Sequence, residues 1–569
     1  MLKLTHYPSR KGAITVEDST GSGKLPRAMR APAAAVLLLL TPLAVGAARA
    51  PGAGAPYLLE LRVSNGSAPF AGDRRLLTTV SPNGDGFRDR ALVSFRLDRA
   101  AQVRMDAVRT ETIRENRAPS VTLWSHTWSL AAGPNRLAWH PRRSVAPRTY
   151  ILRLTVRDAA GRERVYGNYR PWRGQHVDAP VVRVQGIELG FLRRSYAPGE
   201  FASLAIATDA KAFRLQIFAF GSSVKVSEVD VKTNGGAVTP PLEVRWERYR
   251  SARTRLRLVR AGEWPSGLYF LRARAADGRT GYAPMILRPR VLGTNRIAVV
   301  LATNTWQAYN FDDANGDGWG DSWYVSGGQR SVGLQRPFLD FGVPFRFHDW
   351  DLEFISWLNR TGKQVDYLSD DDLERVGSGD ALVRAYDLVV FPGHEEYVTR
   401  HVYDVVGRYR DLGGNLAFLA ANNFFREVTV NGERIVRGKL WRDQGRPEAG
   451  LVGVQYSGSN HGERQAPFVV SGLASDPWAF AGTGLVDGSE FGRYGIEIDS
   501  RSAASPPGTR ALATIPNVLG PGRTAEMTYY ENPAGAKVFA AGTLNFAASL
   551  GDPQVAALVE NVWTRLSRP

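Results

Sequence analysis

Short runs in which apolar and polar residues alternate mark the chain from residue 56 to about residue 292. Examples are residues 91–97 (Ala-Leu-Val-Ser-Phe-Arg-Leu) and 150–156 (Tyr-Ile-Leu-Arg-Leu-Thr-Val), and turn residues separate such runs. This period of two is typical of half-buried strands in β-sandwiches. We therefore predict two successive all-β, immunoglobulin-like sandwiches, over residues 56–176 and 177–292.

The pattern changes after residue 293. Residues 297–302 form a continuous apolar run, which is typical of a parallel strand covered on both faces. An amphipathic segment that ends at a glycine follows, and strand-like and helix-like segments then alternate. The main predicted elements are strands at 365–368, 386–391, 415–420 and 536–543, and helices at 353–362, 399–412 and 553–565. This alternation predicts an α/β three-layer domain over residues 293–569, with turn-rich sequence and added strands after about residue 430.

The first 55 residues have the order of a secretory signal. Basic residues precede an apolar run at 33–45, and small residues follow it. The run is short for a membrane span, so we predict an exported protein, with an uncleaved N-terminal anchor as the alternative. Met29 is the better start than Met1, because residues 1–28 have no apolar pattern.

Charge and cysteine content exclude several functions. The 569-residue chain carries a net charge of +17, but its basic residues are scattered and no nucleic-acid-binding motif accompanies them. We expect no nucleic-acid partner, whereas an acidic cell-surface polymer remains possible as a partner. The chain has no cysteine, which excludes disulfides, thiolate metal sites and a cysteine nucleophile.

Polar chemistry is best placed at residues 393–397, Gly-His-Glu-Glu-Tyr, directly after an apolar strand. In open α/β sheets, ligands bind beyond the carboxyl ends of the strands. The alternative is a strand-to-helix turn whose acidic residues favour the N-terminus of the next helix. An aromatic and amide-rich segment at 303–310 and an Asn-Asn turn at 422–423 follow two other predicted strands, so both are candidates for the same pocket.

A third pattern is a string of alternating oxygen-bearing residues. Asp313, Asn315, Asp317 and Asp321 alternate with glycines, as in the first half of a calcium loop. Tyr324 stands where the bidentate glutamate is expected, and a similar string occurs at 83–89. The two interpretations are a Ca²⁺ site and a tight turn closed by Asx-type hydrogen bonds.

Five short motifs in the right order resemble the C-terminal domain of the N,N-dimethylformamidase large (beta) subunit. They lie at residues 304–310, 321–324, 335–338, 393–397 and 413–422. The resemblance covers roughly residues 295–567 and implies a fold like that of class I glutamine amidotransferases. It also implies hydrolysis of a small amide by a mononuclear ferric ion held by two tyrosines and a glutamate. Residues 81–89 and 150–161 resemble the immunoglobulin-like domain of flagellar hook-capping proteins.

Carried over by motif, this resemblance assigns the Fe(III) ligands to Tyr309, Tyr324 and Glu396. Phenolates and carboxylates are hard anionic oxygens that suit a trivalent ion, and such an ion polarises an amide carbonyl and lowers the pKa of a bound water. His394 and Asn422 match catalytic positions that orient substrate or water.

Two aromatic residues complete the implied site, Trp306 on the pocket floor and Phe546 on its wall, both expected to contact substrate. Two departures from the family stand beside these assignments. The Asp/Asn/Gly-rich loop is inserted between Tyr309 and Tyr324, and the predicted export and sandwiches are unlike a cytoplasmic enzyme.

The sequence thus predicts an extracytoplasmic, iron-dependent hydrolase of C–N amide bonds. A thiol-dependent amidotransferase is excluded, because the turn that carries the cysteine nucleophile in that class holds Asn422 and Asn423 here. The alternative is a non-catalytic surface module that binds glycan or protein, with calcium at residues 313–321. The substrate, the oligomeric state and the need for a small subunit are left open.

Overall fold

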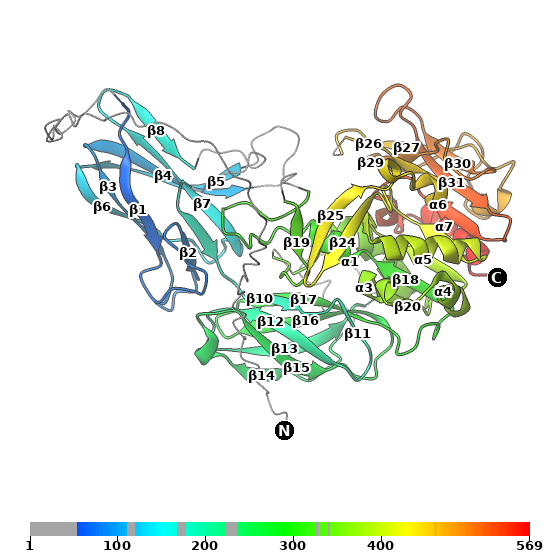
Figure 1. Cartoon of the computed structure of the whole chain (residues 1–569), viewed down its shortest axis with the longest axis horizontal. Coiled ribbons are helices and arrows are strands. Elements are labelled where there is room, and N and C mark those ends of the chain that lie inside the picture. Colours follow the sequence, from blue (N-terminus) through cyan, green and yellow to red (C-terminus); the bar gives the residue numbers. More distant parts are fainter. Residues whose placement is uncertain are drawn as a thin grey trace, which may run out of the picture.

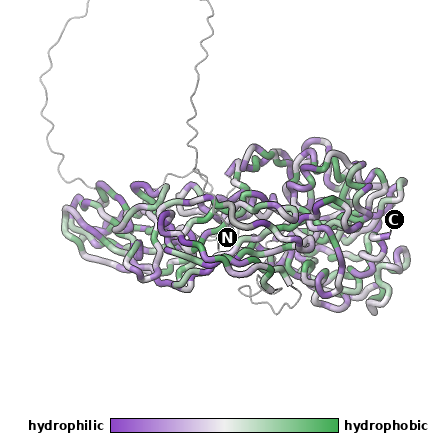
Figure 2. The backbone as a smooth tube through the Cα atoms, turned by 90° about the horizontal axis from the view of Figure 1, so that it is seen from below, coloured by the Kyte–Doolittle hydropathy of each residue, from purple (hydrophilic) through white to green (hydrophobic). Residues whose placement is uncertain are grey.

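The computed structural model describes residues 54–110, 120–167, 178–221, 236–324, 329–339, 342–460 and 462–568. The first sandwich lies at one end of the long axis of the molecule and the larger C-terminal body at the other (Figures 1 and 2). The second sandwich lies between them and, in the view of Figure 1, below them. The predicted export signal lies outside the described residues. Within these residues, no helix is long and apolar enough to span a membrane.

The first sandwich consists of two sheets. One sheet has the order β1-β3-β6, with β1 (Leu58–Ser64), β3 (Ala91–Leu97) and β6 (Gly133–Trp139). The other has the order β2-β9-β7-β4-β5. Its strands are β2 (Leu77–Val80), β9 (Val181–Val184), β7 (Arg148–Arg157), β4 (Ala101–Thr110) and β5 (Ser120–Leu130). A further strand, β8 (Glu163–Tyr166), pairs with β7. Residues that alternate along the strands, such as Val93 and Leu152, are fully buried between the sheets. Strand β9 pairs with β2 and β7, so the first sandwich extends past residue 176.

The second sandwich is also all-β. Its sheets have the orders β10-β12-β15 and β11-β17-β16-β13-β14. The strands are β10 (Glu188–Phe191), β11 (Ser195–Tyr196), β12 (Phe201–Ala207), β13 (Ala212–Ala219), β14 (Leu242–Arg245), β15 (Thr254–Arg260), β16 (Gly267–Ala275) and β17 (Thr280–Leu287). The predicted all-β character of the N-terminal half is therefore confirmed.

A nine-stranded sheet is the centre of the C-terminal region, in the order β20-β18-β21-β23-β32-β31-β30-β27-β28. The first five are parallel: β20 (Asp366–Ser369), β18 (Ile297–Leu301), β21 (Leu388–Phe391), β23 (Asn415–Phe418) and β32 (Lys537–Ala540). The others are antiparallel: β31 (Ala525–Glu531), β30 (Arg510–Ile515), β27 (Ala466–Val470) and β28 (Glu490–Tyr494).

Helices pack on both faces of the parallel strands. Val299 faces a core that contains residues of α2 (Glu353–Arg360) and α7 (Pro553–Leu566). Its neighbour Val300 faces the opposite core, which contains residues of α3 (Asp370–Glu374), α4 (Gly379–Ala385) and α5 (Arg400–Asp411). The Thr399 hydroxyl caps α5 by accepting from Val402 N at 3.1 Å. The chain as a whole is mostly β-sheet, with few helices.

Smaller elements surround the carboxyl ends of the parallel strands. Helix α1 (Thr303–Ala308) follows β18 directly, where the sequence indicated a pocket floor. A four-stranded sheet has the order β19-β25-β24-β22, with β19 (Ser331–Gly333), β25 (Arg434–Leu440), β24 (Arg426–Asn431) and β22 (Tyr397–Val398). The pair β26 (Gln455–Ser459) and β29 (Glu497–Ser500) completes the set.

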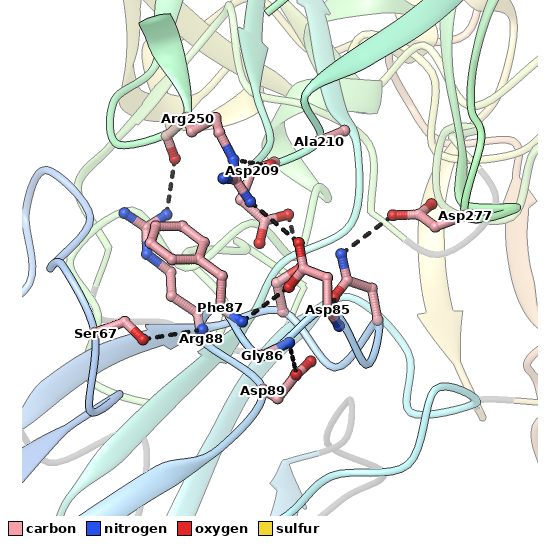
Figure 3. A network of polar contacts seen from close by, with 12 residues as sticks. Ser67, Asp85, Gly86, Phe87, Arg88, Asp89, Asp209, Ala210, Arg250 and Asp277 are labelled. Atoms are coloured by element: carbon pink, nitrogen blue, oxygen red, sulfur yellow. Dashed lines mark hydrogen bonds and ion pairs between the residues drawn. The ribbon is translucent and has the colours of Figure 1, made fainter. Parts of the chain in front are cut away.

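The loop at residues 83–89 joins the two sandwiches (Figure 3). Its carboxylate and amide oxygens accept backbone N–H groups, for instance Asp89 from Gly84 N at 2.8 Å and Gly86 N at 2.7 Å. The fully buried Arg88 donates to Arg250 O in the second sandwich at 2.7 Å. The loop is therefore a self-closed turn at a domain junction.

Candidate active site

The first predicted ligand, Tyr309, is the residue that ends α1. Tyr309 N donates to Thr305 O at 2.9 Å, and its side chain is buried among aromatic rings. Its hydroxyl donates to Glu396 Oε2 in a short hydrogen bond. The ring centroid of Tyr397 lies 5.9 Å away, and the phenol of Tyr397 also interacts with Glu396. Tyr309 and Glu396 are thus brought together as predicted by motif.

Glu396 lies in the turn between β21 and β22. Its backbone N–H donates to Thr305 Oγ1 at 3.2 Å, so the turn is tied to α1. His394 precedes it by two residues and is only 1% exposed. The His394 Nε2 atom lies 3.7 Å from Glu396 Oε2 and 3.6 Å from Glu497 Oε2. Both distances exceed a hydrogen bond, and neither ring nitrogen of His394 has a partner among the described residues.

Asn422 occupies a sharp turn after β23. Its φ of 60° is left-handed, a conformation that costs a non-glycine residue and that asparagine tolerates better than most. The turn is held by β29: Asn422 N donates to both oxygens of Asp499 at 2.9 and 3.0 Å, and Asn422 Nδ2 donates to Glu497 Oε2 at 3.0 Å. Asn422 Oδ1 is buried without a partner among the described residues.

Sequence reasoning missed Glu497, Asp499 and Tyr397. A signal for the two acids was present, because residues 497–499 read Glu-Ile-Asp and alternate residues of a strand share one face. What the pattern does not show is that β29 lies beside Asn422 and His394. Tyr397 directly follows Glu396 in the quoted motif, and its phenol was overlooked.

The inserted loop does not displace Tyr324. Trp323 N donates to Ala308 O at 2.8 Å, so the chain returns to the end of α1 after the loop. The ring centroid of Tyr324 lies 5.3 Å from that of Tyr309 in an edge-to-face arrangement. All three predicted ligands therefore belong to one neighbourhood.

The structure places the two predicted substrate-contacting aromatics in the apolar core. Phe546 is fully buried beside Tyr494 and Phe539. Trp306 packs against Phe347, and its Nε1 donates to Asp351 Oδ2 at 3.2 Å. Both belong to the large core cluster, whereas Tyr309 and Tyr397 belong to a separate one. Trp306 belongs to the same buried cluster as Val299 and Leu301 of β18, the strand that directly precedes α1.

The loop at 313–321 is closed by its own hydrogen bonds. Asp313 accepts from Gly316 N at 2.7 Å and Gly318 N at 2.8 Å, and Asp321 accepts from Ala314 N at 3.0 Å. Asn315 and Asp317 form Asx-type turns in the same way. These bonds fit the turn interpretation, and calcium at this loop stays a prediction.

The same loop docks on the first sandwich. Thr110 Oγ1 donates to Gly318 O at 2.8 Å, and Arg74 donates to Asn315 O at 2.7 Å. Trp319 packs in a small apolar cluster with Val108, Ile151 and Ala179 of that sandwich. Both Asn-Gly-Asp-Gly strings therefore stand at domain junctions.

Burial controls the ionisation of the site. It raises the pKa of Glu396 to about 7. Burial, together with the nearby Glu396 carboxylate, raises the pKa of Glu497 to about 8. Burial also raises the pKa of Asp499 to about 7 and lowers the pKa of His394 to about 3. The pKa of Tyr309 is raised by burial and by the same Glu396 charge.

These shifts predict a pH dependence of stability. A carboxyl whose pKa is higher in the folded state than in the unfolded state favours the folded state at low pH. This contribution to stability is complete below the unfolded pKa of about 4.3, and it is lost as the pH rises through the folded pKa. We expect the melting temperature of chelator-treated protein to fall between about pH 5 and pH 8. Glu497→Gln is expected to reduce that fall. If the melting temperature of the variant depended on pH as steeply as that of the native protein, the raised pKa of Glu497 would be contradicted.

The residues present fit a hard cation. Buried carboxyl and phenol oxygens converge, and unpartnered polar atoms of His394 and Asn422 stand beside them. Within the part of the chain that the structure describes, no three His, Cys, Asp or Glu side chains form a metal-binding group. A metal at this site would therefore need tyrosine oxygens, which suit a trivalent ion such as Fe³⁺.

The relatives share one name. A protein named N,N-dimethylformamidase beta subunit from Paracoccus aminophilus is 25% identical over 404 residues, which is 53% of this chain and 52% of the relative. Another of that name from Alcaligenes sp is 33% identical over 147 residues, 25% of this chain and 18% of the relative. The chain thus spans about half the length, or less, of the curated relatives it matches.

Solved structures add no argument on fold. Trypsin-activated alpha-2-macroglobulin from Escherichia coli is 9% identical, with 41% of this chain and 17% of that chain covered and a TM-score of 0.22. The predicted likeness of residues 293–569 to class I glutamine amidotransferases is not supported by these comparisons. The family model described as "N,N-dimethylformamidase beta subunit-like, C-terminal" matches residues 236–558, more than half of the chain. The chain therefore belongs to the N,N-dimethylformamidase beta subunit-like family.

Proposed function

We propose that the protein is a metal-dependent hydrolase of C–N amide bonds that acts outside the cytoplasm. The observation that carries the proposal is the buried contact between the Tyr309 hydroxyl and Glu396, with Tyr324 beside it. Family membership supports amide hydrolysis as the reaction class. The predicted signal sequence supports the location, and the substrate class is a small amide.

Tyr309, Tyr324 and Glu396 would hold the ion. When bound, a ferric ion supplies Lewis acidity that polarises an amide carbonyl. Neutral His394, whose two ring nitrogens have no hydrogen-bond partner among the described residues, can accept a hydrogen bond from the attacking water and so orient it. Hydrolysis adds the water oxygen to the carbonyl carbon, breaks the C–N bond and releases a carboxylic acid and an amine.

Glu497 is placed to give a proton to the leaving nitrogen. Its oxygen lies 3.6 Å from His394 Nε2, and its pKa of about 8 keeps the carboxyl protonated near neutral pH. Asn422 fixes this carboxyl through its Nδ2 donor. Aromatic rings pack against the residues of the site. The ring centroid of Trp350 lies 5.0 Å from that of His394, and the ring centroid of Trp323 lies 4.8 Å from that of Tyr397.

We also propose that the C-terminal scaffold is related to that of class I glutamine amidotransferases. Five parallel strands with helices on both faces support this relation. The left-handed turn at Asn422 follows β23, as a nucleophile elbow follows a strand in α/β hydrolases. An asparagine cannot act as such a nucleophile, so the turn here positions an amide instead.

The name "beta subunit" of the relatives suggests that a second kind of subunit joins the active assembly. We propose such a partner for this chain, with self-association as the alternative. Size-exclusion chromatography of the full chain, alone and mixed with a candidate small subunit, separates these outcomes.

Metal analysis of the purified full chain tests the function. We expect stoichiometric iron, a visible tyrosinate charge-transfer band, and amine release from simple dialkyl amides. Tyr309→Phe should lose the band and the activity, whereas Tyr403→Phe, a buried tyrosine outside the site, should keep both. Calcium alone, or no metal with no amide hydrolysis, would favour a non-catalytic surface module.

A further inference from the structure

The outer face of the β1-β3-β6 sheet has a hollow that the hydrolase site does not use. Its volume is about 340 Å³, and its polar lining comes from all three strands. The polar residues that line it are Glu60, Arg62, Ser94, Arg96, Asn135 and Arg136. The hollow belongs to the first sandwich, and Figure 1 shows this sandwich apart from the C-terminal region that contains the candidate active site.

The three arginines leave their charge open to solvent. Arg62, Arg96 and Arg136 are exposed, and within the described residues none of them has an ion pair or a side-chain hydrogen bond. The other sheet of the same sandwich differs, because there Arg104 and Arg153 share the buried Asp106 at 2.8 and 3.3 Å. Glu60 is the one acid in the hollow's lining, and no ion pair joins it to the arginines.

Strand register fixes the spacing of the arginines. Arg62 and Arg136 are the neighbours of Ser94 on its two sides, so their Cα atoms stand about 10 Å apart across the sheet. Arg96 lies two residues from Ser94 on the same face of β3, about 7 Å along the strand. The three arginines thus share one face of the sheet on neighbouring backbone positions, and each guanidinium fork can bind a carboxylate or sulfate group in bidentate fashion.

The other groups of the hollow select among polyanions. Ser94 and Asn135 offer hydrogen bonds of the kind that sugar hydroxyls make. Of the residues that line the hollow, Phe95 alone is aromatic, and it is 3% exposed and packed in the core. Single-stranded nucleic acid is bound largely by stacking on exposed aromatic rings, so this face lacks what a base would need.

We propose that this hollow binds an acidic polysaccharide, with its carboxylate or sulfate groups on Arg62, Arg96 and Arg136. The net charge of +17 attracts polyanions to the whole molecule, and the hollow provides the specific contacts. The first sandwich thereby attaches the protein to an anionic glycan while the C-terminal region acts on its substrate. The inference does not depend on the proposed hydrolase activity.

Titration of the full chain with polygalacturonate, dextran sulfate and neutral dextran tests the proposal, and the first two separate carboxylate from sulfate recognition. The test variant replaces Arg62, Arg96 and Arg136 by serine. A charge-matched control makes the same arginine-to-serine change at three exposed arginines of the same sandwich outside the hollow, Arg142, Arg157 and Arg164. We expect the test variant to weaken binding by more than about tenfold and the control by less than about threefold.

A second variant separates fork geometry from charge. Replacing the three arginines by lysine keeps the charge but removes bidentate binding, so affinity should fall to an intermediate level. Equal losses in the test variant and the control would overturn the proposal, because net charge alone would then explain binding. It is also overturned if the native chain binds neither acidic polymer, or binds single-stranded DNA as tightly. Circular dichroism confirms that each variant is folded.

Discussion

Glu396→Gln is expected to abolish both iron binding and amide hydrolysis while leaving the fold intact. The change keeps the side-chain volume but replaces an anionic oxygen by an amide at the centre of the buried group. Because even outer partners of metal ligands cost 10–100-fold when removed, we expect the activity to fall by more than about a hundredfold. Metal content, the tyrosinate band and amine release measure the effect together.

The neighbouring residue provides the control. Glu395 is equally buried, but its side chain interacts with Asp370 rather than with Tyr309. Glu395→Gln should therefore keep its iron and most of its activity. If Glu396→Gln retained the metal, or if both variants lost it equally, Glu396 would not be a ligand.

Asp209→Ala is expected to destabilise the junction between the two sandwiches by about 3 kcal/mol, because a buried ion pair loses one partner. Asp209 is fully buried, and its Oδ1 accepts from Ser81 Oγ at 2.8 Å and from Arg279 at 2.5 Å. The figure lies at the low end for broken buried pairs, since Arg279 keeps Asp277 as a second partner. Urea denaturation followed by tryptophan fluorescence measures the loss.

Asp277→Ala is the matched control for that prediction. It removes the other carboxylate of the same arginine, but its side chain is 24% exposed, so water replaces much of the interaction. We expect a loss below about 1 kcal/mol, as for surface ion pairs. Equal effects of the two substitutions would show that burial of Asp209 does not set the stability of the junction.

Local pattern predicted the three longer helices because helix and strand periods are properties of short segments. The predicted helix at 399–412 is α5 (Arg400–Asp411), and the one at 353–362 is α2 (Glu353–Arg360). Thr399 and the glycines after each helix mark these ends in the sequence itself. Helices α1, α3 and α4 were missed as helices, because their 6, 5 and 7 residues are too few to show a period.

The sequence by itself determined the all-β N-terminal half, the apolar parallel strands and the order of the motifs that contain Tyr309, Tyr324 and Glu396. Only the tertiary structure decided that Glu497 and Asp499 lie beside Asn422, and that the inserted loop docks on the first sandwich and returns Tyr324 to Tyr309. Periodicity and motifs depend on neighbours along the chain. Contacts between β29 and the turn after β23 depend on how sheets pack, and residues 75 positions apart carry no local trace of that packing.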